Sequence, residues 1–160
     1  MADPLSVSAS AIAVLGTGAA CANTLWSIIQ GIRDAPDELM ALSNGVNNLN
    51  VIIDEARKVC ESLATNDSST TQFIETLESL LKEAEDVLGA LNDLVSKYKL
   101  GVWKLDQSVS WLCRKTRAKK CLMRLQDTRM NIVVLLTSRT VSVFLRFYLQ
   151  YFRNICSIFS

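Results

Sequence analysis

The sequence predicts an all-α protein, a bundle of four or five long antiparallel amphipathic helices. Apolar residues recur at steps of three and four along most of the 160 residues, and this spacing marks one face of a helix. Only Pro4 and Pro36 interrupt the chain, so everything after them is compatible with helix. No alternating strand pattern bounded by hairpin turns is present. The length and the 49% hydrophobic content suit one domain with a real core.

The first predicted helix covers residues 4–32, which contain no charged residue. Its expected inward face consists of Leu5, Ile12, Leu15, Ala19, Ala22, Trp26 and Ile29, with Ser8 at one further position. The segment also contains a G-x-G pattern, but no strands follow that would build a dinucleotide-binding fold. We interpret Gly16 and Ala20 instead as small residues at a close contact between helices.

A second helix is expected after Pro36, because Asp37 and Glu38 suit the positive end of a helix dipole. Its apolar seam is the most regular in the chain: Leu39, Leu42, Val46, Leu49, Ile53, Ala56, Cys60 and Leu63. The polar residues 65–71 predict a short turn, so the third helix should run antiparallel to the second.

The third predicted helix ends at Gly101 and has a wide apolar stripe, which implies more than one packing partner. Its seam consists of Ile74, Leu77, Leu81, Ala84, Leu88, Leu91, Val95 and Tyr98, widened by Phe73, Leu80, Val87 and Leu94. A later helix from about Lys115 to Thr137 should complete the bundle, with Ala118, Leu122, Leu125, Ile132 and Leu136 inward.

We expect residues 1–138 to form the bundle and residues 139–160 to form an aromatic, basic tail. The tail carries arginines every seven residues opposite aromatic side chains: Arg139, Phe144, Arg146, Phe147, Tyr151, Phe152 and Arg153. Its apolar residues contribute roughly −3 to −6 kcal/mol to membrane insertion, while two arginines cost up to about 2.5–3.5 kcal/mol each. This balance favours a helix in the membrane interface over a span. Packing on the bundle or on a partner, and an atypical C-terminus of a shortened gene, are the alternatives.

A basic patch lies at the beginning of the later helix and is concealed by the net charge of +1. It consists of Arg114, Lys115, Arg117, Lys119, Lys120 and Arg124, without one acid among them. One interpretation is attraction to anionic lipid headgroups or to a protein partner, at roughly 1 kcal/mol per basic residue near a membrane. A solvated helix face is the other. Nucleic acid is not expected, because no recognisable reading motif accompanies the patch.

Catalytic and metal chemistry are not expected. The chain has no histidine, which is the commonest general base and metal ligand. Its five cysteines include no C-x-x-C pair, which indicates reduced thiols in a cytoplasmic protein. The acids of the third helix suit a solvated face: Glu75, Glu78, Glu83, Glu85 and Asp86. We therefore expect neither an enzyme nor a bound cofactor, metal or small-molecule substrate. A secretory signal is not expected either, since no basic residue precedes the apolar N-terminus.

Three segments carry a resemblance to a known family: the opening M-A-D-P-L-S-V-S-A-S-A-I-A-V-L, the R-D-A-P-D-E-L-M-A-L at Arg33 to Leu42, and the R-L-Q-D-T-R-M-N-I at Arg124 to Ile132. Together they resemble the fungal N-terminal domain of STAND (NLR-like) proteins, the HeLo-like family. The same domain is also labelled as the N-terminal domain of azaphilone pigments biosynthesis cluster protein L. The resemblance covers roughly residues 1–138.

The resemblance implies a helical signalling domain placed ahead of nucleotide-binding and repeat domains, similar to the membrane-targeting effectors of fungal programmed cell death. It assigns membrane entry to the uncharged helix from Leu5 to Ile32. Contacts with the second helix would hold that helix in check, through Leu39, Leu42, Val46 and Leu49. The expected function is self-association, with membrane targeting or permeabilisation by the N-terminal helix at the membrane periphery. A purely structural protein–protein interaction module is the alternative.

Overall fold

The computed structural model describes residues 4–31, 37–63, 68–101 and 115–158. These residues form four helices, namely α1 (Pro4–Gly31), α2 (Asp37–Ser62), α3 (Ser68–Gly101) and α5 (Lys115–Ile158). The described part of the chain contains no strand, so the predicted all-α class is confirmed. The predicted turn at 65–71 lies partly outside the described residues.

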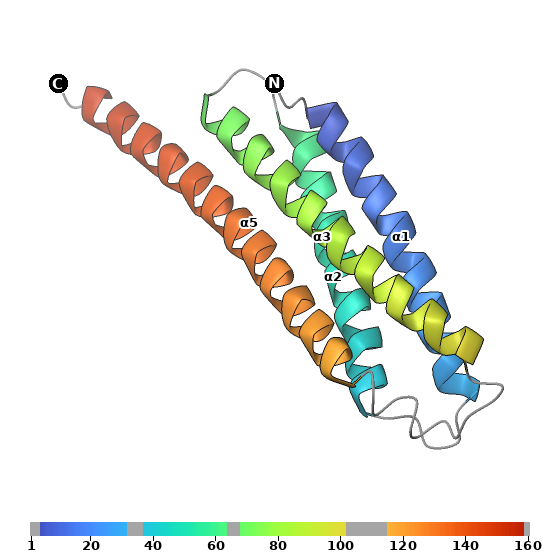
Figure 1. Cartoon of the computed structure of the whole chain (residues 1–160). Coiled ribbons are helices and arrows are strands. Elements are labelled where there is room, and N and C mark those ends of the chain that lie inside the picture. Colours follow the sequence, from blue (N-terminus) through green and yellow to red (C-terminus); the bar gives the residue numbers. More distant parts are fainter. Residues whose placement is uncertain (1–3, 32–36, 64–67, 102–114, 159–160) are drawn as a thin grey trace.

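The four helices lie side by side as a bundle in which the chain direction alternates from each helix to the next (Figure 1). Helix α1 packs against α2 and α3, and α5 packs against the same two helices from the other side. Helices α2 and α3 make only slight contact, and the described residues of α1 and α5 make none. The contacts therefore form a ring, with α1 and α5 at opposite corners.

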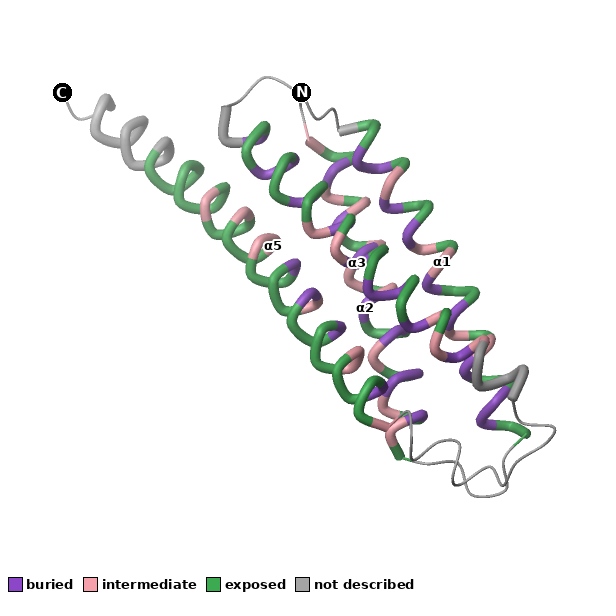
Figure 2. Tube along the Cα trace, viewed as in Figure 1, coloured by how far each residue is buried: buried purple, intermediate pink, exposed green. Residues whose placement is uncertain are grey.

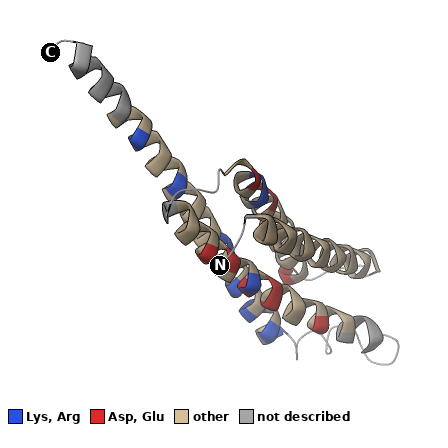
Figure 3. Ribbon diagram, turned by 90° about the horizontal axis from the view of Figure 1, so that it is seen from above, with Lys and Arg blue, Asp and Glu red and all other residues tan. Residues whose placement is uncertain are grey.

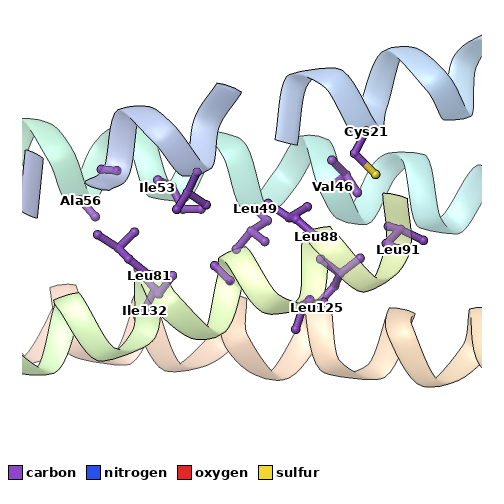
Figure 4. Packing of buried hydrophobic residues seen from close by; sticks show 14 of the residues in the cluster. Cys21, Val46, Leu49, Ile53, Ala56, Leu81, Leu88, Leu91, Leu125 and Ile132 are labelled. Atoms are coloured by element: carbon purple, nitrogen blue, oxygen red, sulfur yellow. The ribbon is translucent and has the colours of Figure 1, made fainter. Parts of the chain in front are cut away.

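The core is built from the seams predicted for α2 and α3. Every described residue of both seams is buried except Leu63, which is half-buried against the core. The side chain of Tyr98 lies outside the described residues. On α5, Ala118, Leu125 and Ile132 are buried, and Leu122 and Leu136 are half-buried, as expected. Figure 4 shows Ile132 near Leu81 of α3, and Leu125 near Leu88 of the same helix.

The prediction for the inward face of α1 was wrong. The buried side chains are Val7, Ser8, Ala11, Val14, Cys21, Leu25, Ile28 and Ile29. Of the expected set only Ser8 and Ile29 are buried; Leu15 and Ala22 are half-buried, and Leu5, Ile12, Ala19 and Trp26 are exposed. The real seam lies one position away and alternates at steps of three and four just as the expected one does. Because α1 has no charged face, both stripes satisfy the same pattern.

The close contact between α1 and α2 forms at Gly18 and not at the predicted Gly16 and Ala20. A Cβ built on Gly18 would lie 2.0 Å from Oδ1 of Asn50 on α2. A Cβ on Gly16 meets nothing within 4 Å, and Ala20 is exposed. A hydrogen bond fastens the start of α1, since the Ser8 hydroxyl donates to Oε1 of Glu61 at 3.1 Å.

Helix α5 is much longer than the helices it packs against. Its 44 residues span about 66 Å, whereas the 26 residues of α2 and the 34 residues of α3 span about 39 Å and about 51 Å. Every residue from Val143 to Leu149 is exposed, including those on the side that faces the bundle earlier in the helix (Figure 2). We call residues 143–158 the overhang; it is about 24 Å long. Most of the predicted tail is therefore the C-terminal part of α5.

The Cys21 thiol gives the fold a testable pH dependence. Cys21 lies beside Val46 in the core (Figure 4), and burial raises the pKa of its thiol from 9.0 to about 12. Above pH 9 the unfolded chain ionises this thiol while the folded chain does not. The unfolding free energy should therefore fall by about 1.4 kcal/mol per pH unit as the pH rises from 9 towards 12.

We expect Cys21→Ala to remove this contribution from the alkaline slope. Burial also raises the pKa of the Cys60 thiol, to about 11, so Cys60 should still contribute to the slope in this variant. Urea unfolding under reducing conditions at several pH values measures the slope. Equal slopes in the wild type and in Cys21→Ala would show that the thiol is not shielded in the folded protein.

Candidate functional site

The outer face of α5, turned away from the other three helices, carries a continuous apolar stripe. Its exposed members follow at steps of three, four or seven: Met123, Met130, Val134, Val141, Phe144 and Tyr148. Helical geometry places them on one side of α5, opposite the buried Leu125 and Ile132. We call this set the outer stripe. It runs for about 38 Å, from the bundle into the overhang.

Positive charge is concentrated on the same helix. Residues 115–158 contain nine of the 17 basic residues of the chain but only one of its 16 acids, Asp127. Figure 3 shows basic residues gathered at the beginning of α5 and spaced more widely along the rest of it. A basic helix with one exposed apolar face is the pattern of helices that bind anionic membrane surfaces.

The structure divides the predicted basic patch. Nζ of Lys115 lies 2.7 Å from Oε1 of Glu38, so this cation is paired with the start of α2. Arg117, Lys119, Lys120 and Arg124 are exposed on α5. Arg114 lies outside the described residues.

Three of these cations line a groove between α3 and α5. The groove has a volume of about 470 Å³ and is formed by Ala90, Asp93, Leu94, Arg117, Lys120, Cys121 and Arg124. Lys119 is absent from this lining, because its position on the helix turns it towards the outer stripe. Partial burial raises the pKa of the Cys121 thiol, and the charge of Arg124 offsets only part of that rise.

The candidate residues of the predicted tail lie in two different settings. Arg139 still belongs to the bundle: its Nη2 donates to Oγ1 of the buried Thr70 at 2.9 Å, and its guanidinium lies 5.9 Å from the centre of the Phe73 ring. Phe144 and Phe147 lie on the overhang and are 72% and 70% exposed, respectively. Arg146 is exposed on the other side of the helix. The side chains of Tyr151, Phe152 and Arg153 are outside the described residues.

Four of the candidate residues on α1 form a second exposed stripe. Leu5, Ile12, Ala19 and Trp26 recur every seven residues on the side of α1 that faces away from the core. This α1 stripe and the outer stripe of α5 lie on opposite sides of α2 and α3. The two stripes therefore cannot both rest on one flat surface while the bundle is intact.

Length and composition make both α1 and α5 candidates for crossing a membrane. The most apolar 18-residue window has a mean hydropathy of 1.7 within Leu5–Gly31 and of 1.6 within Lys115–Leu149. One third of the most apolar window of α1 is buried in the bundle, but only 6% of that of α5. By this measure α5 has far more apolar surface without a partner than α1.

The acidic side chains of the described helices lie mostly at the surface. No cluster of three or more cysteine, aspartate or glutamate side chains able to hold a metal ion is found among the described residues. Four of the five acids predicted on a solvated face of α3 are exposed, and Glu83 is half-buried. The ion pairs among Asp54, Arg57 and Lys58 are exposed contacts along α2, each of which contributes little to stability.

The groove is the feature that sequence reasoning missed. Its residues come from two helices, and only their pairing in space brings Asp93 next to the basic patch. Comparison of the chain with family models, with curated proteins and with solved structures gives no match. The arrangement of α5 is therefore the starting point for a functional proposal.

Proposed function

We propose that this chain is a non-enzymatic helical signalling module that attaches to anionic membranes through the outer stripe and overhang of α5. The observation that carries the proposal is the exposure of these residues. An apolar face about 38 Å long costs free energy in water unless a lipid surface or a partner covers it.

The charge distribution supports a membrane as the covering surface. Each basic residue held near an anionic leaflet contributes roughly 1 kcal/mol, and α5 carries nine of them against one acid. The basic beginning of α5 and its aromatic end both adjoin the outer stripe. If α5 lies flat on the bilayer, its cations reach the headgroups while its aromatic side chains enter the acyl boundary.

The overhang suits the interface better than a span. Its length of about 24 Å falls short of the roughly 30 Å of a bilayer core. At 100° per residue, Phe144, Phe147 and Tyr148 share one side of the helix, and Arg146 lies on the opposite side. Extending the apolar segment towards Ile132 would require Arg139 to leave Thr70.

The role implied by the HeLo-like resemblance is compatible with this proposal and adds self-association and a fungal receptor setting to it. In that form, membrane entry and permeabilisation fall to α1, whose exposed stripe supplies the apolar surface. The alternative function is a protein–protein interaction module, in which another helical protein covers the outer stripe.

Vesicle flotation tests the proposal. The full chain is expected to float with anionic vesicles and far less with neutral ones, and a chain that ends at Ser142 is expected to bind more weakly. Dye leakage from the same vesicles then shows whether binding proceeds to permeabilisation. If a folded full chain floats with neither kind of vesicle, the interaction module is the better account.

A further inference from the structure

The groove between α3 and α5 lies on a flank of α5, apart from the outer stripe. Its α5 wall carries Arg117, Lys120 and Arg124 at steps of three and four, so all three cations lie on one side of the helix. None of the three forms an ion pair with any residue that the structure describes. Three like charges around one cavity repel one another, and an anion placed between them removes that repulsion.

The α3 wall has a different chemistry. Ala90 and Leu94 contribute apolar surface, and Asp93 contributes the only carboxylate among the described residues of the lining. No ion pair joins Asp93 to the three cations within the described residues. The three cations and one carboxylate leave the described lining with an excess of two positive charges. A ligand that fits this groove needs negative charge towards α5 and a hydrogen-bond donor towards Asp93.

We propose that the groove binds a phosphorylated polyol, with its phosphate groups held by Arg117, Lys120 and Arg124 and a hydroxyl donating to Asp93. Guanidinium groups bind phosphate through paired, charge-assisted hydrogen bonds, and lysine adds a point charge. A cavity of about 470 Å³ is in the size range of small-ligand sites. The ligand is either free in solution or the headgroup of a lipid, since both present the same chemistry.

Calorimetric titration of the full chain with inositol trisphosphate tests the site in solution, where no membrane contributes. The adjacent lysines provide a matched pair, because only Lys120 lines the groove. We expect Lys120→Gln to weaken binding about fivefold, as about 1 kcal/mol for one exposed charge contact implies. Lys119→Gln removes the same charge one residue away and should change binding less than about twofold.

Asp93→Asn provides a test in the opposite direction. Removal of the carboxylate leaves an amide that still accepts a hydrogen bond, so binding of inositol trisphosphate should strengthen by about fivefold. All three substitutions are at exposed or partly exposed surface positions, and circular dichroism checks that the helices are retained. The absence of binding by the wild-type chain, or equal losses in Lys119→Gln and Lys120→Gln, would overturn the proposal.

Vesicles distinguish the two sources of the ligand. If the ligand is a headgroup, vesicles that contain phosphatidylinositol bisphosphate bind the chain more tightly than phosphatidylserine vesicles of equal charge, and free inositol trisphosphate competes. If the ligand is free, the titration succeeds and the two kinds of vesicle bind equally. Failure of the titration leaves flotation through the outer stripe untouched, so this proposal and the membrane proposal fail separately.

Discussion

Replacing Phe144 and Phe147 by glutamate is expected to weaken binding to anionic vesicles by at least about 100-fold. Burial of each phenylalanine in an apolar environment contributes roughly 1.5–3 kcal/mol, and 1.4 kcal/mol corresponds to a tenfold change in affinity. The added carboxylates also repel an anionic surface. Both rings are exposed beyond the bundle, so the substitutions should leave the melting temperature unchanged. Flotation over a series of lipid concentrations measures the effect.

The matched control is Leu5→Glu with Ile12→Glu on α1. These residues are also exposed apolar side chains, and the pair adds the same charge on the opposite side of the bundle. We expect this control to bind vesicles as the wild type does. The reverse result, lost binding in the α1 pair and retained binding in the α5 pair, would assign the contact to the N-terminal helix, as the HeLo-like resemblance implies.

Leu25→Ala is expected to cost about 2–5 kcal/mol of unfolding free energy. Its side chain is 0% exposed within the core, so truncation removes buried methyl groups and leaves a cavity between α1 and its neighbours. A loss of this size is a large fraction of the stability of a typical domain. Denaturant unfolding followed by circular dichroism measures it.

Trp26→Ala is the control at the next position. Tryptophan is larger than leucine, but the Trp26 side chain is 56% exposed. Its truncation should therefore lower the unfolding free energy by less than about 1 kcal/mol. If the face of α1 expected from the sequence were buried, Trp26→Ala would cost more unfolding free energy than Leu25→Ala. A larger loss for Trp26→Ala than for Leu25→Ala would therefore return α1 to that first orientation.

The seams of α2 and α3 could be predicted because charge marks their outer faces. On α2, Asp54 and Lys58 are exposed or partly exposed on the side away from Ile53 and Cys60, so only one apolar stripe is available to the core. The same holds for α3, where the acids occupy the outer side. In such helices only one face has apolar residues at alternating steps of three and four, so the buried face can be identified.

Helix α1 shows why the same method fails without charges. The difference in hydrophobicity between its two faces is the smallest among the four described helices. Two apolar stripes therefore compete for the core. What decides between them is packing: Gly18 lets α1 approach α2 closely at Asn50, whereas a side chain as bulky as that of Trp26 would not fit at such a contact. Small residues at heptad spacing do not identify the buried face from the sequence, because Ala13 and Ala20 show the same spacing and are exposed.

The candidate surfaces of α5 were only partly accessible from sequence. The basic patch and the aromatic, basic segment could be found because both are local in the chain. The start of α3 decides which of these residues belong to the bundle. Arg139 packs on Thr70 and Phe73 at that start, whereas Phe144 projects beyond it. The groove depends likewise on the alignment of Asp93 with Lys120, which no local pattern records.

The slight contact between α2 and α3 constrains any mechanism in which α1 leaves the bundle. The two helices are joined chiefly through α1 and α5, each of which bridges them. Withdrawal of α1 would uncover apolar side chains on both α2 and α3 at once, since both contribute to the same core. Such an open form needs a substitute helix, and a second copy of the chain can provide its own α1 by exchange. Opening would then be inseparable from oligomerisation, and its midpoint would depend on protein concentration.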